Sequence, residues 1–101
     1  MDTKLLISEV KARFGHNASK EYLRDKYTSK LIIADQGGLW KATPELLTFL
    51  ATTFSKTLVI VDDFGNPVKV NRVELLVKLT DVYNSVMEEW HNEWTELEKK
   101  R

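Results

Sequence analysis

The C-terminal third of the chain carries a long apolar pattern that no glycine or proline interrupts. From Leu76 to Leu97 the large apolar residues recur every three or four positions, which is the period of an amphipathic helix. The preceding Asn71-Arg72-Val73-Glu74 has the order of a capping box, so the sequence predicts a helix over about 72–98. Such a helix is about 40 Å long, whereas a compact domain of this size spans about 35 Å. We therefore expect the helix to reach beyond the body of the protein.

Two tryptophans lie in the last turns of this predicted helix. Trp90 and Trp94 would form an unusually large apolar patch if the projecting helix stood alone in water. A second copy in a two-fold dimer would cover them most simply, so we expect a homo-oligomer. The alternatives are that the helix bends back over its own domain, or that a different protein covers it. The candidate interface residues are Tyr83, Val86, Met87, Trp90, Trp94 and Leu97.

The rest of the chain predicts an α+β fold in a single domain, residues 1–101, with antiparallel β-hairpins forming a small sheet packed on helices. Short β-branched runs followed by turn residues predict hairpins over 31–42 and 57–70. The run 57–61 is apolar on both faces, which is typical of a central strand. Capping residues at Asn17 and Thr43 predict helices over 18–27 and 44–54.

The segment 5–14 fits two periods. Its alternation of apolar and polar residues predicts a half-buried strand that joins the sheet and ends at Gly15-His16-Asn17. However, Leu6, Val10 and Phe14 are spaced by four, and the residues between them suit a helix. We expect the strand.

Charge is balanced overall but not along the chain. The protein has 15 basic and 15 acidic residues, yet residues 1–30 hold seven basic groups against four acidic ones, and residues 81–101 hold six acidic against three basic. Such ends can attract each other within one chain or between chains. There is no cysteine, no apolar run long enough for a membrane span, and no signal-peptide pattern at the start. These features indicate an intracellular, cytoplasmic protein without a membrane partner.

Chemical motifs are weak, and we expect no enzyme, catalytic residue, cofactor or metal. Glu88 and His91 have the i, i+3 spacing of di-iron ligands, but the further carboxylates that such sites need are missing. Asp62 and Asp63 open a turn rich in turn-forming residues, and adjacent extended residues point to opposite faces, which makes them poor acid–base partners. His16 fits a loop-ordering role.

Nucleic acid is the second candidate partner. Basic residues alternate with aromatic ones near the N-terminus, an arrangement that can contact phosphates and stack on bases. Glu21 and Asp25 interrupt this patch, and the chain is not basic overall. The alternative function is therefore a small regulator that binds nucleic acid through segment 13–30. The candidate contacts are Arg13, Lys20, Arg24, Lys26 and Lys30.

Three stretches resemble small uncharacterised proteins of marine contractile-tailed bacteriophages, including cyanophages. They are residues 29–42 (SKLIIADQGGLWKA), 63–67 (DFGNP) and 89–94 (EWHNEW). The resemblance implies a short viral protein, present in the host cytoplasm or the virion, with a structural, assembly or host-modulating role. It carries no site residue over to this chain.

Overall fold

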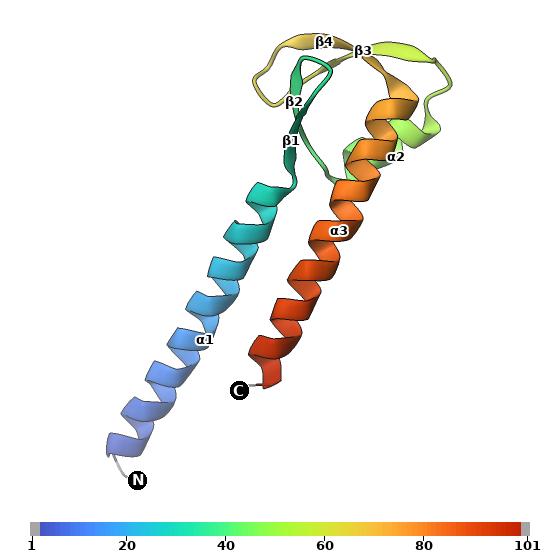
Figure 1. Ribbon diagram of the computed structural model, residues 1–101. Helices are drawn as coiled ribbons and strands as arrows, with labels where there is room; N and C mark the ends of the chain where they lie inside the picture. The colour runs from blue at the N-terminus through green and yellow to red at the C-terminus, as the bar shows by residue number, and fades with distance from the viewer. Residues whose placement is uncertain (1–2, 100–101) are drawn as a thin grey trace.

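The protein has an α+β fold drawn out into an elongated body (Figure 1). The computed structural model describes residues 3–99, and the side chains of residues 17–99. The body measures 66 × 24 × 19 Å with a radius of gyration of 19.4 Å, against about 13 Å for a compact chain of this length. Two parts produce this shape. We call residues 3–30 and 83–99 the stalk, and residues 31–82 the head.

The N-terminal segment is one long helix, α1, from Thr3 to Lys30. The predicted strand over 5–14 is therefore wrong, and Gly15-His16-Asn17 does not end an element, so the predicted helix 18–27 is only the end of a longer one. The segment follows the helical, four-residue spacing of Leu6, Val10 and Phe14 rather than the two-residue alternation of a strand. One internal glycine costs a helix only about 1 kcal/mol, which the helix formers on both sides can offset.

Two antiparallel hairpins form the β structure of the head, as predicted. In the first, β1 (Ile32–Asp35) pairs with β2 (Gly38–Lys41), and in the second, β3 (Thr57–Val61) pairs with β4 (Pro67–Asn71). Each pair is a separate two-stranded sheet. The first turn has positive φ at Gln36 and Gly37. A Cβ at Gly38 would lie 2.5 Å from the Trp40 ring, so this glycine makes room for the indole.

Strand β3 is not the central strand that its composition predicts. It pairs with β4 alone, and its side chains alternate between exposed and half-buried. Leu58 and Ile60 pack against the core, whereas Val59 and Val61 lie on the open face. Both faces of β3 carry apolar residues, but within this chain only one face packs against the core.

The two remaining helices begin at the predicted caps. Helix α2 spans Pro44–Thr52, two residues shorter than expected, and the Leu46 N–H donates to Thr43 Oγ1 over 3.2 Å. Helix α3 spans Arg72–Lys99, and the Glu74 N–H donates to the Asn71 side chain over 3.1 Å. Helix α3 packs on both α1 and α2, so it connects the stalk to the head. Within residues 3–99 no helix is both long enough and apolar enough to cross a membrane.

The core fills the junction between head and stalk. Trp40 from β2 is buried there, and its indole N–H donates to the Asp35 carbonyl over 2.8 Å. Leu75 and Leu79 from α3 are fully buried beside it in the same cluster. The other large, fully buried side chains are Tyr27, Leu50 and Val70.

The core makes a direct stability prediction. Leu79→Ala should lower the free energy of unfolding by about 2–5 kcal/mol, because it removes buried methylenes and leaves a cavity where α3 meets the head. Val77→Ala on the exposed side of the same helix is the matched control and should change it by less than about 0.5 kcal/mol. Urea unfolding of both variants measures this, and equal losses would contradict the assigned core.

Candidate functional site: an aromatic face on the stalk

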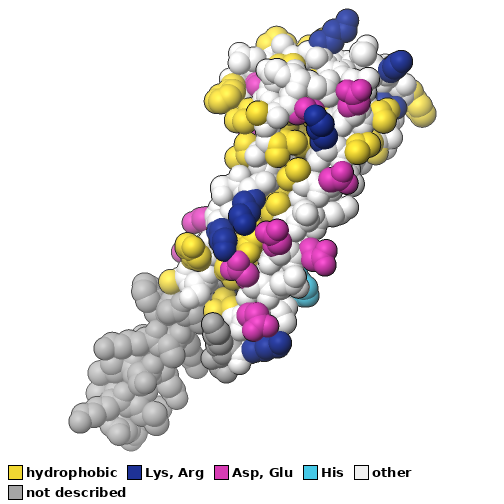
Figure 2. All heavy atoms as spheres, in the orientation of Figure 1, with side chains coloured by type: hydrophobic (Ala, Val, Ile, Leu, Met, Phe, Trp, Pro, Cys, Tyr) yellow, Lys and Arg dark blue, Asp and Glu magenta, His cyan; other side chains and the backbone are white. Residues whose placement is uncertain are grey.

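Helices α1 and α3 lie antiparallel and are linked by a ladder of ion pairs. Lys30 Nζ lies 3.4 Å from Glu89 Oε2, and Lys26 Nζ lies 2.7 Å from Glu93 Oε1. Lys20 Nζ lies 3.7 Å from Glu98 Oε1. Basic and acidic side chains accordingly lie side by side along the stalk in Figure 2. The opposite net charges of the chain ends thus meet within one chain.

Tyr27 is the centre of this helix pairing. Its ring is buried and stacks on Trp90, with centroids 6.1 Å apart and planes 10° from parallel. Its hydroxyl donates to Glu93 Oε1, the same oxygen that accepts from Lys26. The ammonium groups of Lys26 and Lys30 lie 5.1 and 4.9 Å from the ring centroid, within the range of cation–π attraction.

The shared carboxylate shifts the titration of all three groups. The bonds from Lys26 and then Tyr27 lower the pKa of Glu93, because both donors favour its charged form. The hydrogen bond to Glu93 in turn raises the pKa of Lys26 and that of Tyr27, since each proton is held more tightly.

Most of the predicted interface residues are used inside this hairpin. Val86 is buried in the core, and Tyr83, Trp90 and Leu97 pack against it half-buried. The cover on this side of α3 comes from α1 of the same chain. Much of this cover comes from the segment 18–27, which was predicted as a helix, but the sequence pattern did not indicate that it would pair with the C-terminal helix.

Met87 and Trp94 remain on the outer side of α3. Trp94 is 40% exposed, and the His91 ring stacks on it with centroids 6.1 Å apart. Together with Trp90 these side chains line a shallow hollow of about 280 Å³. A second hollow of about 240 Å³ lies between Trp90, Trp94 and the α1 residues Lys20, Glu21 and Arg24. We call the surface made by these seven residues the aromatic stalk face.

The α1 contribution to this face was missed from the sequence. Lys20 and Arg24 were predicted as nucleic-acid contacts, and Glu21 as a residue that interrupts that basic patch. The opposite net charges of the two chain ends indicated that these segments could attract each other. They did not specify which residues of the two helices lie side by side.

The candidate nucleic-acid contacts do not form an open basic patch among the described side chains. Lys20, Lys26 and Lys30 each pair with a glutamate of α3. Arg24 is exposed beside Glu21 on the rim of the aromatic stalk face. The Arg13 side chain lies outside the described side chains. Carboxylates next to the lysines reduce the positive potential that phosphates would meet.

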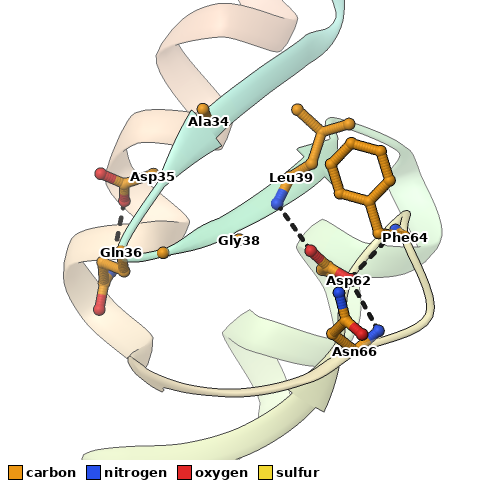
Figure 3. Close-up of a pocket in the computed structure, with 9 residues that line it drawn as sticks. Ala34, Asp35, Gln36, Gly38, Leu39, Asp62, Phe64 and Asn66 are labelled. Carbon is orange, nitrogen blue, oxygen red and sulfur yellow. Dashed lines mark hydrogen bonds between the residues drawn. The ribbon is translucent and has the colours of Figure 1, made fainter.

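A hollow of about 500 Å³ lies in the head, where the two hairpins meet (Figure 3). Asp62 lines it and is buried, and its carboxylate accepts from the N–H groups of Leu39, Phe64 and Asn66 at 3.0, 3.0 and 2.9 Å. These backbone donors lower the pKa of Asp62. Asp62 therefore stabilises the turn and connects the hairpins, in keeping with the polar turn predicted for this segment.

The other carboxylate of this hollow is also engaged. Asp35 accepts from Lys78 Nζ over 2.6 Å, and that hydrogen bond lowers the pKa of Asp35. Glu88 and His91 are exposed on α3. Among the side chains described, no group of three or more His, Cys, Asp and Glu is arranged to hold a metal ion.

Comparison with known protein families, characterised proteins and solved structures found no match. The function is therefore argued from the geometry of this chain.

The Glu93 contacts predict how stability depends on pH. Because the folded pKa of Glu93 is lowered, its contribution is present above the unfolded value, about 4.3, and is lost as pH falls through the folded value. Glu93→Gln should therefore destabilise the protein at pH 7, and the difference from wild type should shrink towards pH 3. Urea midpoints at both pH values measure this.

Glu88→Gln is the control, since Glu88 is exposed on the same helix. It should change the urea midpoint little at either pH. A Glu93→Gln difference that stayed constant from pH 7 to pH 3 would show that the ladder does not depend on the Glu93 charge.

Proposed function

We propose that this protein is a small, non-enzymatic, oligomeric structural or assembly protein that self-associates through the aromatic stalk face. The observation that carries the proposal is the exposed Trp94, which with Met87, Trp90 and His91 lines an open apolar hollow on a two-helix stalk. Tryptophan, methionine and arginine are the residue types enriched at protein interfaces. Their clustering here distinguishes this surface from scattered exposed apolar side chains.

The shape of the stalk favours a second copy as the partner. Two helices cover each other along one seam only, so a hairpin in water leaves the two broad faces beside that seam open. Two such hairpins packed face to face form a four-helix bundle, which buries one face of each. A two-fold arrangement uses the same patch on both copies and needs no other component.

The rim of the face has charges suited to self-pairing. Glu21 and Arg24 lie on α1 beside the exposed indoles. In a two-fold dimer a patch that carries both signs can set Arg24 of one copy against Glu21 of the other. This pairing would orient the contact, while the apolar hollow would supply most of its stability.

The nucleic-acid alternative has less support. Three of its five candidate side chains already have carboxylate partners within the chain. The resemblance to small bacteriophage proteins is compatible with an assembly role in the host cytoplasm or the virion, and both locations remain part of this proposal.

The proposal predicts the mass of the protein in solution. Wild type should scatter light as a multiple of the 11.7 kDa chain. Trp94→Ala combined with Met87→Ala should lower the mass, because the hollow loses its walls while the Tyr27–Trp90 stack remains. Tyr22→Ala removes a more exposed aromatic ring from α1 outside the aromatic stalk face and should leave the mass unchanged.

Circular dichroism should show that all these variants keep their helices. A wild-type mass of one chain, or a mass that the double variant leaves unchanged, would refute self-association through this face.

The same assignment predicts weak binding to nucleic acid. In a salt titration with generic DNA and RNA we expect no salt-dependent binding, because the ion pairs occupy Lys20, Lys26 and Lys30. Fluorescence anisotropy from about 50 to 200 mM salt covers the range in which phosphate contacts lose most affinity. Salt-dependent binding that Arg24→Ala weakens would instead support the regulator alternative.

A further inference from the structure

Strand β3 presents an open edge. We call the β3–β4 hairpin the ribbon. The backbone hydrogen bonds at its two ends show which residues of β3 face β4: Arg72 N–H donates to the Lys56 carbonyl, and Asp62 N–H donates to the Asn66 carbonyl. In this antiparallel register the even-numbered residues of β3 exchange bonds with β4, so Thr57, Val59 and Val61 direct their N–H and C=O groups away from it. No backbone hydrogen bond from elsewhere in the described chain reaches these three residues.

The opposite edge of the ribbon is closed. On β4, Pro67 has no N–H to donate, and Lys69 adds a charge. The Asn71 N–H donates to Gln36 Oε1 over 2.6 Å, and Gln36 Nε2 donates back to the Asn71 carbonyl over 3.3 Å. The features that protect an edge against pairing are therefore present on β4.

Strand β3 lacks that protection. Its five residues, Thr57–Val61, include no charge and no proline, and Val59 and Val61 are 61% and 67% exposed. This composition belongs to a central strand, but the strand sits at an edge. A long apolar edge without charges is a template for another strand.

We propose that the open edge of β3 pairs antiparallel with β3 of a second copy, centred on Val59. The two hairpins would then form one four-stranded sheet, with β3 of each copy in the middle. This would satisfy the outward backbone groups of Thr57, Val59 and Val61. It would also exceed the three strands that a sheet typically needs to be stable in water.

Two exposed phenylalanines are placed symmetrically about Val59 in the sequence, which argues for a second copy as the occupant. Phe54 lies five residues before Val59 and Phe64 five residues after it, and their side chains are 99% and 73% exposed. In an antiparallel pair centred on Val59, the loop before β3 of one copy, which carries Phe54, approaches the turn after β3 of the other, which carries Phe64. Within the strand, Val59 of one copy meets Val59 of the other, and Thr57 lies level with Val61.

The available area is sufficient for a dimer. An interface of ordinary size buries about 800 Å² on each partner. A phenylalanine ring buries about 150–250 Å² when covered, so the two rings of each copy would provide around half of that area. The two valines and the strand backbone would add to it. The absence of charge on β3 gives a charged peptide from another protein no electrostatic advantage over a second copy.

This inference deepens the proposed self-association but rests on a separate surface. The β3 edge lies in the head, while the aromatic stalk face lies near the far end of α3 (Figure 1). A chain with two distinct two-fold contacts can build a closed tetramer or an extended chain of copies. Either result suits an assembly protein.

Single cysteines test the register directly, since the natural chain has none. In the proposed pair the two Val59 residues exchange hydrogen bonds, which sets their Cα atoms about 5.5 Å apart, within the range of a disulfide. Val59→Cys should therefore form a covalent dimer under a mild oxidant. Lys69→Cys is the matched control, because it lies opposite Val59 on the same ribbon face. It should cross-link at least about tenfold more slowly, since its distance to the second copy exceeds that range.

Each cysteine variant should also be made with Trp94→Ala and Met87→Ala, which remove the stalk contact. Preferential cross-linking at Val59 in this background shows that the edge pairs independently of the stalk. Equal rates at the two positions, or no cross-linking at either, overturn the edge proposal and leave the stalk proposal to its own mass measurement.

Val59→Pro is a second, non-covalent test. The Val59 N–H points away from β4, so proline there removes no bond of the ribbon but blocks a second strand. The stalk-deficient protein should remain a dimer by light scattering. Adding Val59→Pro should reduce it to one chain, and adding Lys69→Pro should not. A dimer that survives Val59→Pro in the folded protein contradicts edge pairing.

Discussion

The pairing of α1 with α3 determines the shape of this protein. Tyr27 stacks on Trp90, and its hydroxyl shares Glu93 with Lys26, so one aromatic contact and one ion pair occur at the same level of the stalk. Ion pairs on a surface contribute little stability individually. Here three of them lie along the seam between the helices, on both sides of the Tyr27–Trp90 stack. The buried rings supply the apolar contact that holds the helices together.

The pairing of α1 with α3 also explains which side chains of the stalk stay uncovered. Glu89, Glu93 and Glu98 pair with Lys30, Lys26 and Lys20, so the charges of these three lysines are balanced within the chain. Part of the apolar surface of α3 stays uncovered by α1. A helix pair covers only the side chains in its seam, and Met87 and Trp94 lie outside that seam. Among the described side chains, the lysines of α1 are thus paired with carboxylates, whereas Met87 and Trp94 are not covered by the other helix.

Local chemistry was enough to predict most of the head and the long C-terminal helix. The caps at Thr43 and Asn71 and the turns of both hairpins depend on neighbouring residues, so the sequence pattern specifies them. The error at residues 5–14 has a different origin. That segment fits both periods, and only its continuity with the rest of α1 resolves the choice. The contacts of the aromatic stalk face were beyond prediction as well, because Trp90 and Tyr27 are 63 positions apart and their meeting depends on the whole fold.

Strand β3 was predicted to be central but lies at an edge, and its apolar composition still needs a physical explanation. Its composition is that of a strand buried on both sides, yet within residues 3–99 it has one paired strand, β4. If the apolar residues served the monomer alone, Val59 and Val61 would gain nothing over polar residues on an open face. The neighbouring β4 carries proline and lysine in the equivalent role, which shows that this fold accommodates a protected edge. The contrast between the two edges of one ribbon is therefore most simply explained by a second strand that completes the sheet.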